Sequence, residues 1–446
     1  MFGRVLVANR GEIAVRVIRA LHELGIEAVA IYSTADRDAL HVRLADHAVC
    51  VGPPTASESY LSIPSVVAAA VTTGCEAVHP GYGFLAENPA FVTACVDNDL
   101  VFVGPPADVM ATMGDKISAK QAMRAASVPT VPGTEGATTV AAARDAAEEI
   151  GFPILLKATA GGGGKGMRLV TSPADLEDAF GMAAAEAEAA FGDPTMYVEK
   201  ALVPARHVEI QVLCDADGGV LTLGERECSI QRRHQKLIEE SPSAALTPEL
   251  REQMEDAAER ACRAVGYRNA GTFEFLLGPD SSFYFIELNA RLQVEHPVTE
   301  LCTGIDLVRE QLRVAAGEPL SVTGRAPRRG HAIEIRVNAE DPEHDFRPAP
   351  GRVDRFEPPQ GPGVRTDTFI ESGATVSPFY DSMVAKVIVW DADRPAAIAR
   401  AERALGELVV EGLPTTREVA LQVLGSEPFR RGTYSTSTLE ELRVVA

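Results

Sequence analysis

Polar side chains with catalytic chemistry alternate with apolar ones in one stretch of the sequence, from Phe283 to His296. On an extended strand, side chains two residues apart point to the same face. One face of this stretch would be apolar, whereas the other would carry carboxylate, amide and guanidinium groups. These groups belong to Glu287, Asn289, Arg291, Gln293 and Glu295. Since a strand seldom exceeds about ten residues, we expect the strict alternation to end near Arg291.

A further carboxylate lies just upstream, at Glu274 within the apolar run 272–277. The linking residues 278–282 are Gly, Pro, Asp and Ser, which predicts a hairpin between the two runs. Glu274 and Glu287 could then meet across paired strands. Two carboxylates and an amide oxygen suit a hard divalent cation, Mg²⁺ or Mn²⁺, that shares its coordination with phosphate. The plainer explanation is an antiparallel strand with one solvated face.

A run of glycines, 161–164, is followed by Lys165 and Gly166. The run satisfies the spacing G-x-G-x-x-G, but it lies between two predicted strands with no helix after it, so dinucleotide binding is not supported. It also lacks the Ser or Thr that ligates Mg²⁺ in a P-loop. What remains is a flexible loop whose amides can surround phosphate oxygens, with Lys165 adding charge. A flexible hairpin connector is the alternative.

Several cations could neutralise such a phosphate or bind another anion. Lys157 ends the strand before the glycine loop, and Lys116 follows a Met-Gly-Asp segment. The stretch 225–236 concentrates positive charge in an acidic protein, which indicates an anionic ligand, although a solvated charge run explains it equally well. Arg336 lies in an apolar strand, where an arginine seldom stays without an anionic partner. His207 stands alone, and its sequence context is more typical of a structural histidine.

The composition limits the classes of partner. The chain has 446 residues, 46% hydrophobic and 24% charged, as in ordinary globular proteins. Its net charge of −21 argues against nucleic acid or an anionic membrane as the main partner. The N-terminus has no signal-peptide pattern, and no apolar run reaches membrane-spanning length. The seven cysteines are scattered without a CxxC pair, which indicates reduced thiols in a cytoplasmic protein.

The elements that must position these residues fall into successive groups. Residues 4–103 alternate short apolar strands with amphipathic helices, which predicts a largely parallel sheet with helices on both faces. Its turn at 79–84 follows the carboxyl end of a strand, where such sheets bind ligands, although a plain Gly/Pro turn is an equal alternative. A linker at 128–136 leads to a small unit that carries the glycine loop and could move as a lid. Mixed strands and helices follow, and short strands dominate from about Gly330.

From the residues alone, we expect an enzyme that uses ATP and Mg²⁺. It would have a hinged glycine lid, metal-binding carboxylates on a hairpin and a guanidinium-rich site for a small anion. A nucleotide-binding regulatory protein without catalysis is the alternative from another class.

Several segments together resemble one family. They are MGDK at 113–116, KATAGGGGKGM at 157–167, VEK at 198–200, RHVEIQ at 206–211, QRRHQK at 231–236, GTFEF at 271–275 and ELNARLQVEHPVTE at 287–300. They look like the motifs of the biotin carboxylases, which are ATP-grasp enzymes. The similarity extends from residues 5–13 to residues 380–383, which is essentially the whole chain.

The resemblance implies an α/β and α+β multidomain fold. Residues 1–113 would form a Rossmann-like N-terminal domain with a parallel sheet. Residues 114–330 would form the ATP-grasp core, in which 131–203 is the mobile glycine-rich lid. Residues 331–446 would form a C-terminal domain of mixed β structure.

The resemblance also implies a role for each matching residue. The residues implied for ATP are Lys116, Lys157, Gly162, Gly163, Gly164, Glu199, Lys200, Leu202, His207, Gln231, His234, Glu274 and Glu287. Those implied for Mg²⁺ or Mn²⁺, with two ions expected, are Glu274, Glu287 and Asn289. Those implied for bicarbonate and biotin are Arg291, Gln293, Val294, Glu295, Arg336 and Tyr82. The implied catalytic set is Glu295 as the base, with Arg336, Arg291 and Lys236.

The reaction implied by the resemblance is the ATP-dependent carboxylation of biotin. Bicarbonate would attack the γ-phosphate, and the resulting carboxyphosphate would release CO₂ to N1 of biotin. The implied partners are a biotin carboxyl carrier protein, carboxyltransferase subunits and a second copy of the chain. No Met-Lys-Met biotinylation site follows the last motif, so we expect a separate carrier.

The implied pathway is the first half-reaction of acetyl-CoA or acyl-CoA carboxylase in fatty acid biosynthesis. A pyruvate carboxylase or another biotin-dependent carboxylase is an alternative. Another ATP-grasp ligase that makes an acyl- or carbamoyl-phosphate would share the lid and the metal hairpin.

Overall fold

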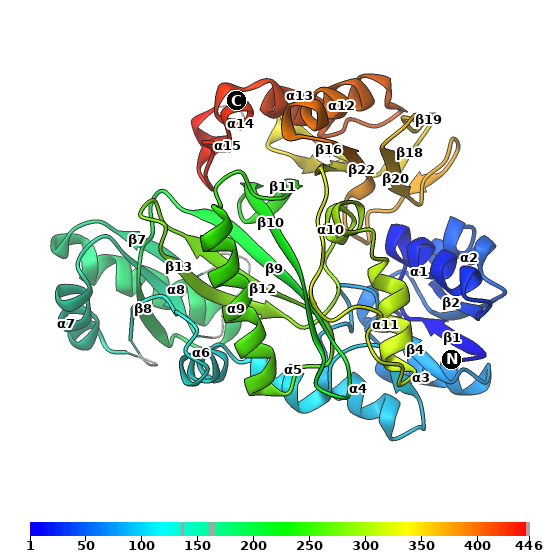
Figure 1. Cartoon of the computed structure of the whole chain (residues 1–446), viewed down its shortest axis with the longest axis horizontal. Helices are drawn as coiled ribbons and strands as arrows, with labels where there is room; N and C mark the ends of the chain where they lie inside the picture. Colours follow the sequence, from blue (N-terminus) through cyan, green and yellow to red (C-terminus); the bar gives the residue numbers. More distant parts are fainter. Residues whose placement is uncertain (135–137, 160–165, 443–446) are drawn as a thin grey trace.

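The computed structural model describes residues 1–134, 138–159 and 166–442. In Figure 1 the N-terminal residues lie on the right, and residues around 140–200 form a separate lobe on the left. The C-terminal residues lie at the top, and long strands of the middle of the chain connect these parts. The functional residues predicted above come from all of these parts, so the fold must bring distant segments together.

The N-terminal sheet is parallel, with the strand order β3-β2-β1-β4-β5. One face packs against α1 and α11, and the other against α3 and α4. Because both faces are covered, Val5 and its neighbour Leu6 are both fully buried. The predicted parallel sheet with helices on both faces is confirmed. Its elements are β1 Arg4–Val7, α1 Gly11–Glu23, β2 Glu27–Ser33, α2 Leu40–Leu44, β3 His47–Gly52, α3 Ile63–Thr72, β4 Ala77–His79, α4 Pro89–Val96 and β5 Val101–Phe102, with α11 Leu307–Ala315 from later in the chain.

Two helices, α5 (Ala107–Gly114) and α6 (Lys116–Ala125), lead to the small lobe. Its antiparallel sheet has the order β7-β6-β8 and an alanine-rich core. Leu155 pairs with Glu199 across β6 and β8, so Lys157, two residues along β6, shares a face with Glu199. The lobe consists of α7 Val140–Ile150, β6 Ile154–Ala158, β7 Met167–Val170, α8 Leu176–Phe191 and β8 Met196–Lys200. The glycines 162–164, predicted to bind phosphate, lie outside the described residues.

The large sheet has nine strands, eight of them in the order β13-β12-β9-β10-β11-β15-β22-β20. Neighbouring strands along this order are antiparallel. The β11–β15 pair carries the sheet across the limit predicted between residues 330 and 331. Its strands are β9 Arg206–Cys214, β10 Val220–Arg232, β11 Gln235–Ser241, β12 Asn269–Leu277, β13 Phe283–Asn289, β14 Gly324–Arg325, β15 His331–Asn338, β20 Val364–Thr368 and β22 Met383–Asp391.

The central strands of this sheet have one apolar and one polar face. On β9, Val208 and Ile210 belong to the core that contains α9 (Pro248–Val265). The alternate residues His207 and Glu209 point to the opposite face, yet they are also buried. The polar face therefore lines an interior site, not the outer surface.

The C-terminal strands have the same division into two faces. One face of β15 and β22 packs on α12 (Arg394–Glu407) and α13 (Arg417–Gly425), and α10 (His296–Thr303) and α1 approach these strands from elsewhere in the chain. Shorter elements complete this part: β16 Glu340–Asp341, β17 Arg347–Pro348, β18 Gly351–Arg352, β19 Arg355–Glu357, β21 Thr375–Val376, β23 Val409–Glu411, α14 Glu427–Arg431 and α15 Thr438–Glu441.

Three local expectations need correction or completion. The strand expected over Arg352–Phe356 is two separate strands, β18 and β19, which pair with different partners. The polar stretch 225–236 is only partly solvated, because residues 225–230 are buried in β10, whereas Arg233, His234 and Gln235 are exposed at the turn to β11. Helix α10 begins at His296, after residues 290–295 that follow the hairpin, and no element was predicted there.

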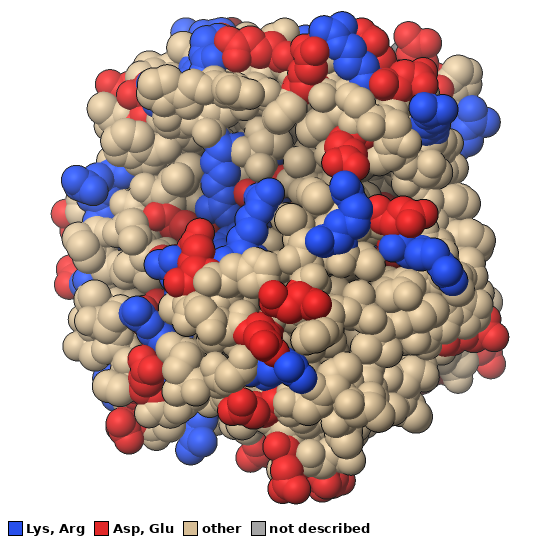
Figure 2. All heavy atoms as spheres, turned by 90° about the vertical axis from the view of Figure 1, so that its right-hand side faces the viewer, with Lys and Arg blue, Asp and Glu red and all other residues tan. Residues whose placement is uncertain are grey.

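No helix of residues 1–134, 138–159 and 166–442 combines the length and apolar character needed to cross a bilayer. On the face of the molecule in Figure 2, acidic and basic side chains are interspersed. Although the net charge is −21, this face of the molecule is not uniformly acidic.

A core substitution tests the packing of the hairpin formed by β12 and β13 on α9. Phe275 is fully buried and contacts the rings of Phe283 and Phe285. Phe275→Ala should lower the free energy of unfolding by about 3 to 5 kcal/mol, because it removes buried surface and leaves a cavity. Val96→Ala, at a side chain that is 63% exposed, is the control and should change stability by less than about 0.5 kcal/mol. Equal transitions in denaturant for both variants would contradict this packing.

Candidate active site

Acidic side chains lie in register across the central strands. Glu209 on β9 pairs with Glu274 on β12, which pairs with Glu287 on β13. Arg226 on β10 pairs with Glu209 from the other side, and its Nε donates to Glu209 Oε1 at 2.5 Å. The predicted hairpin and the predicted facing of Glu274 and Glu287 are therefore confirmed. Glu209 was not predicted, although its spacing of two from His207 on a strand places both on one face.

A single amine joins three of the buried carboxylates. Lys236 Nζ lies 2.7 Å from Glu209 Oε2, 2.9 Å from Glu274 Oε1 and 2.6 Å from Glu295 Oε1. Burial disfavours the charged amine, but Cys228 and the carboxylates outweigh it and raise the pKa of Lys236. The charge therefore stays on Lys236, and it neutralises part of an acidic cluster that is almost completely buried.

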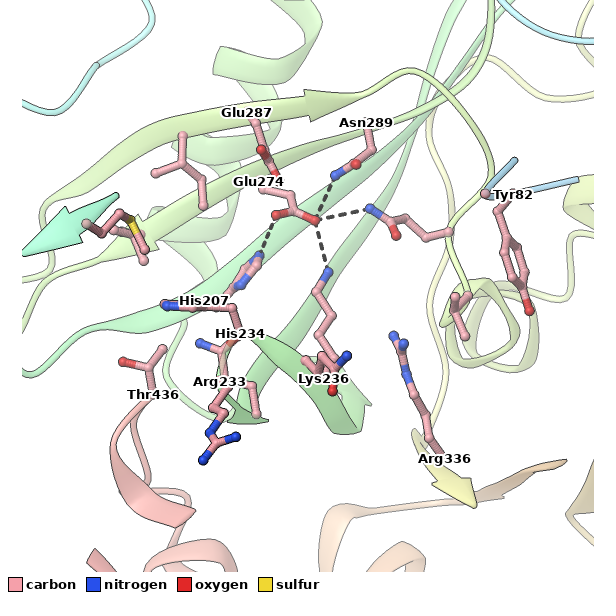
Figure 3. Close-up of a pocket in the computed structure, with 18 of the residues that line it drawn as sticks. Tyr82, His207, Arg233, His234, Lys236, Glu274, Glu287, Asn289, Arg336 and Thr436 are labelled. Carbon is pink, nitrogen blue, oxygen red and sulfur yellow. Dashed lines mark hydrogen bonds and ion pairs between the residues drawn. The ribbon is translucent and has the colours of Figure 1, made fainter. Parts of the chain in front are cut away.

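Glu274 is the centre of the hydrogen-bond network in Figure 3. Its Oε1 accepts from Asn289 Nδ2 at 2.8 Å and from Gln293 Nε2 at 3.1 Å, in addition to Lys236. Its Oε2 lies 3.0 Å from His207 Nε2. Burial would lower the pKa of His207, but the charge of Glu274 outweighs it and raises that pKa. His207 is thus paired with a buried carboxylate and also lines the cavity.

The oxygen atoms of Glu274, Glu287 and Asn289 fit a hard divalent cation. Glu274 and Glu287 face each other across the hairpin, and the side chain of Glu287 is exposed towards the cavity. Burial and the charge of Glu274 raise the pKa of Glu287, although His207 and Lys236 oppose this shift. Two nearby carboxylates and an amide oxygen provide the donor set that Mg²⁺ and Mn²⁺ prefer.

Glu295 precedes α10 and is completely buried. Its Oε2 accepts from Arg336 Nη2 at 2.9 Å, and its Oε1 faces Lys236 and, at 3.7 Å, Cys228 Sγ. Burial alone would raise the pKa of Glu295, but Lys236, Arg336 and Arg226 outweigh it and hold the pKa well below its usual range. The carboxylate is therefore ionised and held between two cations.

Arg336 is shared between two carboxylates. Its Nη2 lies 2.5 Å from Glu239 Oε1 on the neighbouring strand β11, as well as against Glu295. Burial raises the pKa of Glu239 to about 7, although Arg336 opposes this shift. The anionic partner predicted for Arg336 exists, but Glu239 itself could not be chosen from the sequence, because the β11–β15 pairing joins segments almost a hundred residues apart.

Arg291 is held at the edge of the hairpin. Its Nε donates to Glu87 Oε2 at 2.8 Å, its Nη1 to Gln293 Oε1 at 2.9 Å and its Nη2 to Asn289 Oδ1 at 2.9 Å. Glu87 also accepts from the backbone N–H of Ala290 at 2.8 Å. Glu87, which belongs to the N-terminal part and was not predicted, thus fixes the guanidinium beside the β12–β13 hairpin.

A second group of cations gathers at the small lobe. Lys157 Nζ lies 2.6 Å from Glu199 Oε2, and Lys120 is paired with the same carboxylate. Lys200 instead donates to the carbonyl oxygens of Gly151 and Phe152, at 2.9 and 3.1 Å. Lys120 was not predicted, although it follows the predicted Lys116 by four residues on α6, which places both on one face of the helix.

One cavity of about 1380 Å³ connects these groups. Of the predicted residues that the structure describes, it is lined by Tyr82, Lys116, Lys157, Glu199, Lys200, Leu202, His207, Gln231, His234, Lys236, Glu274, Glu287, Asn289, Arg291, Gln293, Val294 and Arg336. Glu295 does not line the cavity itself. It is completely buried and bonds to Lys236, which does line the cavity. The cavity thus joins a cation-lined end at the small lobe to an end with two arginines, and the carboxylate hairpin lies between them.

A small lobe set against a long antiparallel sheet with paired carboxylates is the architecture of an ATP-dependent ligase of the ATP-grasp class. Three family descriptions match successive parts of the chain. They are "Biotin carboxylase, N-terminal domain" at residues 1–110, "Carbamoyl-phosphate synthase L chain, ATP binding domain" at 115–323 and "Biotin carboxylase C-terminal domain" at 334–441.

Known proteins match the chain over its length. The biotin carboxylase of Nostoc sp. is 52% identical over 99% of this chain and 99% of its own. A pyruvate carboxylase subunit of Methanothermobacter thermautotrophicus is 50% identical over 99% of this chain and 90% of its own. The biotin carboxylase domain dimer of Hydrogenobacter thermophilus 2-oxoglutarate carboxylase, solved with MgADP, ADP and bicarbonate, has a TM-score of 0.94 and 45% identity and covers 100% of this chain and 99% of its own.

The chain belongs to the biotin carboxylase family. The prediction of an ATP-dependent ligase that carboxylates biotin is confirmed at the level of the family.

Removing the shared amine should make stability depend on pH in a new way. In the parent, Lys236 holds the pKa of Glu295 low, so that carboxylate contributes stability above its unfolded pKa, near pH 4.3, which is lost as the pH falls. In Lys236→Met, burial without the amine should raise the pKa of Glu295 and Glu209, so stability should instead fall as the pH rises. We expect a loss of about 3 to 5 kcal/mol at pH 8 and a smaller loss near pH 5.5.

Thermal unfolding of both proteins without divalent cations, at several pH values, measures this difference. Arg263→Met removes an exposed ion pair with Glu259 and is the control, which should show no pH-dependent loss. Parallel pH profiles for the parent and Lys236→Met would disprove the shared-amine account.

Proposed function

We propose that the chain carboxylates biotin on a carrier protein, using ATP and bicarbonate, with the predicted site residues in the roles that the family resemblance implies. One observation carries the proposal. Lys236 Nζ bonds Glu274, which lies on the β12–β13 hairpin opposite Glu287, and Glu295, which faces Arg336. A phosphoryl group at the hairpin would therefore lie next to the base that acts on bicarbonate.

The nucleotide would occupy the end of the cavity at the small lobe. Lys116, Lys157 and His207 would neutralise its phosphates, with the glycines 162–164 as further donors, while Gln231 and His234 complete the wall. Glu199, Lys200 and Leu202 would frame the base. Lys157 is paired with Glu199 at 2.6 Å, and Lys120 is paired with the same carboxylate, so Glu199 would keep a cation when Lys157 turns to a phosphate.

The divalent ions belong on the oxygen atoms of Glu274, Glu287 and Asn289, with two ions expected. When bound, Mg²⁺ or Mn²⁺ supplies charge neutralisation for the transferred phosphoryl group. The hairpin register fixes the two carboxylates before any ion arrives, so the chain itself sets where the terminal phosphate must lie.

Bicarbonate would bind to Arg291, Gln293 and the backbone at Val294, which line the cavity next to the hairpin. Glu295 would accept the bicarbonate proton while a bicarbonate oxygen attacks the γ-phosphorus and the bond to ADP breaks. The low pKa of Glu295 depends on Lys236 and Arg336. As these cations turn to the incoming anions, the pKa of Glu295 should rise towards that of a working base.

The second step would take place at the end of the cavity with Arg336 and Tyr82. Carboxyphosphate would split into CO₂ and phosphate, the phosphate would take the N1 proton of biotin, and N1 would attack CO₂. Arg336 would stabilise the negative charge on the ureido oxygen, with Lys236 nearby. Buried carboxylates hold both cations beside the cavity before the substrates arrive.

The partners follow from the same proposal. The carrier would be a separate biotin carboxyl carrier protein, and carboxyltransferase subunits would take the carboxyl group to acetyl-CoA or another acyl-CoA in fatty acid biosynthesis. A pyruvate or 2-oxoglutarate carboxylase complex is the second candidate, because relatives with such names are as similar to the chain. We also propose a homodimer, a cytoplasmic location, the domain limits 1–113, 114–330 and 331–446, and closure of the lobe 131–203 as a lid.

The reaction itself can be tested with the purified chain. ATP hydrolysis should require bicarbonate, and free biotin should stimulate it. Stimulation by ammonia or an amino acid, with no response to biotin, would overturn the proposed function in favour of another ATP-grasp ligase. Release of ADP with increasing bicarbonate and biotin is the measurement.

Two substitutions should separate ATP binding from chemistry. Glu295→Gln keeps the shape of the side chain but cannot take the bicarbonate proton, so kcat should fall by roughly a hundredfold or more. Arg336→Ala should abolish the stimulation by biotin. Calorimetric titration should give both variants an ATP affinity close to that of the parent.

Glu259→Gln is the matched control, because Glu259 forms an exposed ion pair with Arg263 on α9. It should keep full turnover. Unchanged turnover in both Glu295→Gln and Arg336→Ala would rule out Glu295 as the base and Arg336 as the group that stabilises biotin.

A further inference from the structure

Lys386 is a completely buried lysine of β22 that does not line the cavity. Its Nζ donates to the carbonyl oxygen of Val294 at 2.8 Å and lies 3.1 Å from Glu12 Oε1 and 3.9 Å from Asp367 Oδ2. Burial disfavours its charge, but Glu12, Glu334 and Asp367 outweigh it and raise the pKa. A charged amine is rarely buried completely unless its partners require it.

The partners of Lys386 come from distant parts of the chain. Glu12 lies on α1, Val294 precedes α10, and Asp367 lies on β20, directly opposite Lys386 in the sheet register. The hydroxyl of Tyr82 donates to the same Glu12 oxygen. One amine thus connects the N-terminal part, the loop after the metal hairpin and the C-terminal strands.

The carbonyl that Lys386 holds has a particular place in the site. It belongs to the peptide that joins Val294 to Glu295, so the hydrogen bond fixes the orientation of this peptide plane. On one side of the plane lies Val294, which lines the cavity beside Arg291 and Gln293, and on the other lies the buried carboxylate Glu295. A rotation of this peptide would displace both groups together.

We propose that Lys386 is a positioning residue for the bicarbonate end of the site. From behind the cavity wall, its ammonium holds the Val294–Glu295 peptide in the orientation that sets the anion contact and the base side by side. The same amine holds Glu12 under Tyr82, so the biotin end is fixed against the same point. This inference rests on the proposed function, because it assumes that bicarbonate binds at Val294 and Glu295.

The competing explanation is that Lys386 only neutralises buried carboxylates. Asp367 does not need it, because Arg365 donates to both Asp367 oxygens, at 2.8 and 2.7 Å. Glu334 does not need it either, because burial raises the pKa of Glu334 well above its usual range and favours the neutral acid. Glu12 is the carboxylate that depends on Lys386, since Lys386 Nζ lies 3.1 Å from its Oε1 and its Oε2 has no hydrogen-bond partner among the described residues. If charge balance were the whole role, removing the amine and the Glu12 charge together would restore the protein.

The test is the double variant Lys386→Met with Glu12→Gln, in which amine and carboxylate charge leave together. Buried ion pairs replaced by neutral groups of similar size are often tolerated, so the thermal midpoint should stay near that of the parent. The bicarbonate KM of ATP hydrolysis without biotin should rise about tenfold, as expected for the loss of one charge-assisted hydrogen bond. The KM for ATP should stay within about twofold.

Two single variants separate the contributions. Glu12→Gln keeps the bond from Lys386 to Val294 and should change the bicarbonate KM less than twofold. Arg251→Met removes a cation from the buried Glu225 on the far side of the sheet, so it should lower the thermal midpoint and leave the bicarbonate KM unchanged.

The outcomes are distinct. A double variant with the bicarbonate KM of the parent would overturn the positioning role of Lys386. An equal rise of the KM for ATP and for bicarbonate would also overturn it, because the damage would then be general. A parent chain whose ATP hydrolysis ignores bicarbonate would overturn the proposed function itself.

Discussion

The site depends on one constraint, that buried carboxylates must share the few cations that are buried with them. Lys236 bonds Glu209, Glu274 and Glu295 at once, and Arg336 bonds Glu239 and Glu295. Burying an isolated charge in such surroundings would cost several kcal/mol, which is comparable to the net stability of a folded domain. Each strand therefore takes the register that completes these pairs. The geometry of the catalytic groups and the pairing of the large sheet are therefore set by the same contacts.

Local patterns were sufficient to predict much of the fold. Helix α9 begins and ends at local signals, because Thr247 caps its first turn and Gly266 ends it in a left-handed conformation. The hairpin of Glu274 and Glu287 followed from alternation and a turn-rich link. The stretch 225–236 was left open, because a sequence of charges predicts a solvated surface unless the opposing strands supply partners.

Glu239 and Lys386 were not predicted, for one physical reason. Glu239 faces Arg336 only because β11 pairs with β15, and Lys386 reaches Val294 only because β22 lies over the loop before α10. Neither contact leaves a signal in either segment alone, since each residue is an ordinary charge on its own strand. Lys120 and Glu209 differ from these, because periodicities of four on a helix and two on a strand place them beside predicted residues.

The same pairing explains how an acidic protein can bind anions. The cations Lys157, Lys236, Arg291 and Arg336 are each already bonded to a carboxylate, so an incoming anion must exchange partners with that carboxylate. An anion that draws both Lys236 and Arg336 away from Glu295 would leave a buried carboxylate unpaired, which is unfavourable. In the proposed roles, bicarbonate would avoid this cost at Glu295, because it carries the proton that neutralises the carboxylate as the cations leave it. Nucleotide phosphate would avoid it at Glu274 and Glu287, because it would arrive with a divalent cation. The arrangement therefore favours ligands that bring their own positive charge, and it disfavours simple anions of the same size.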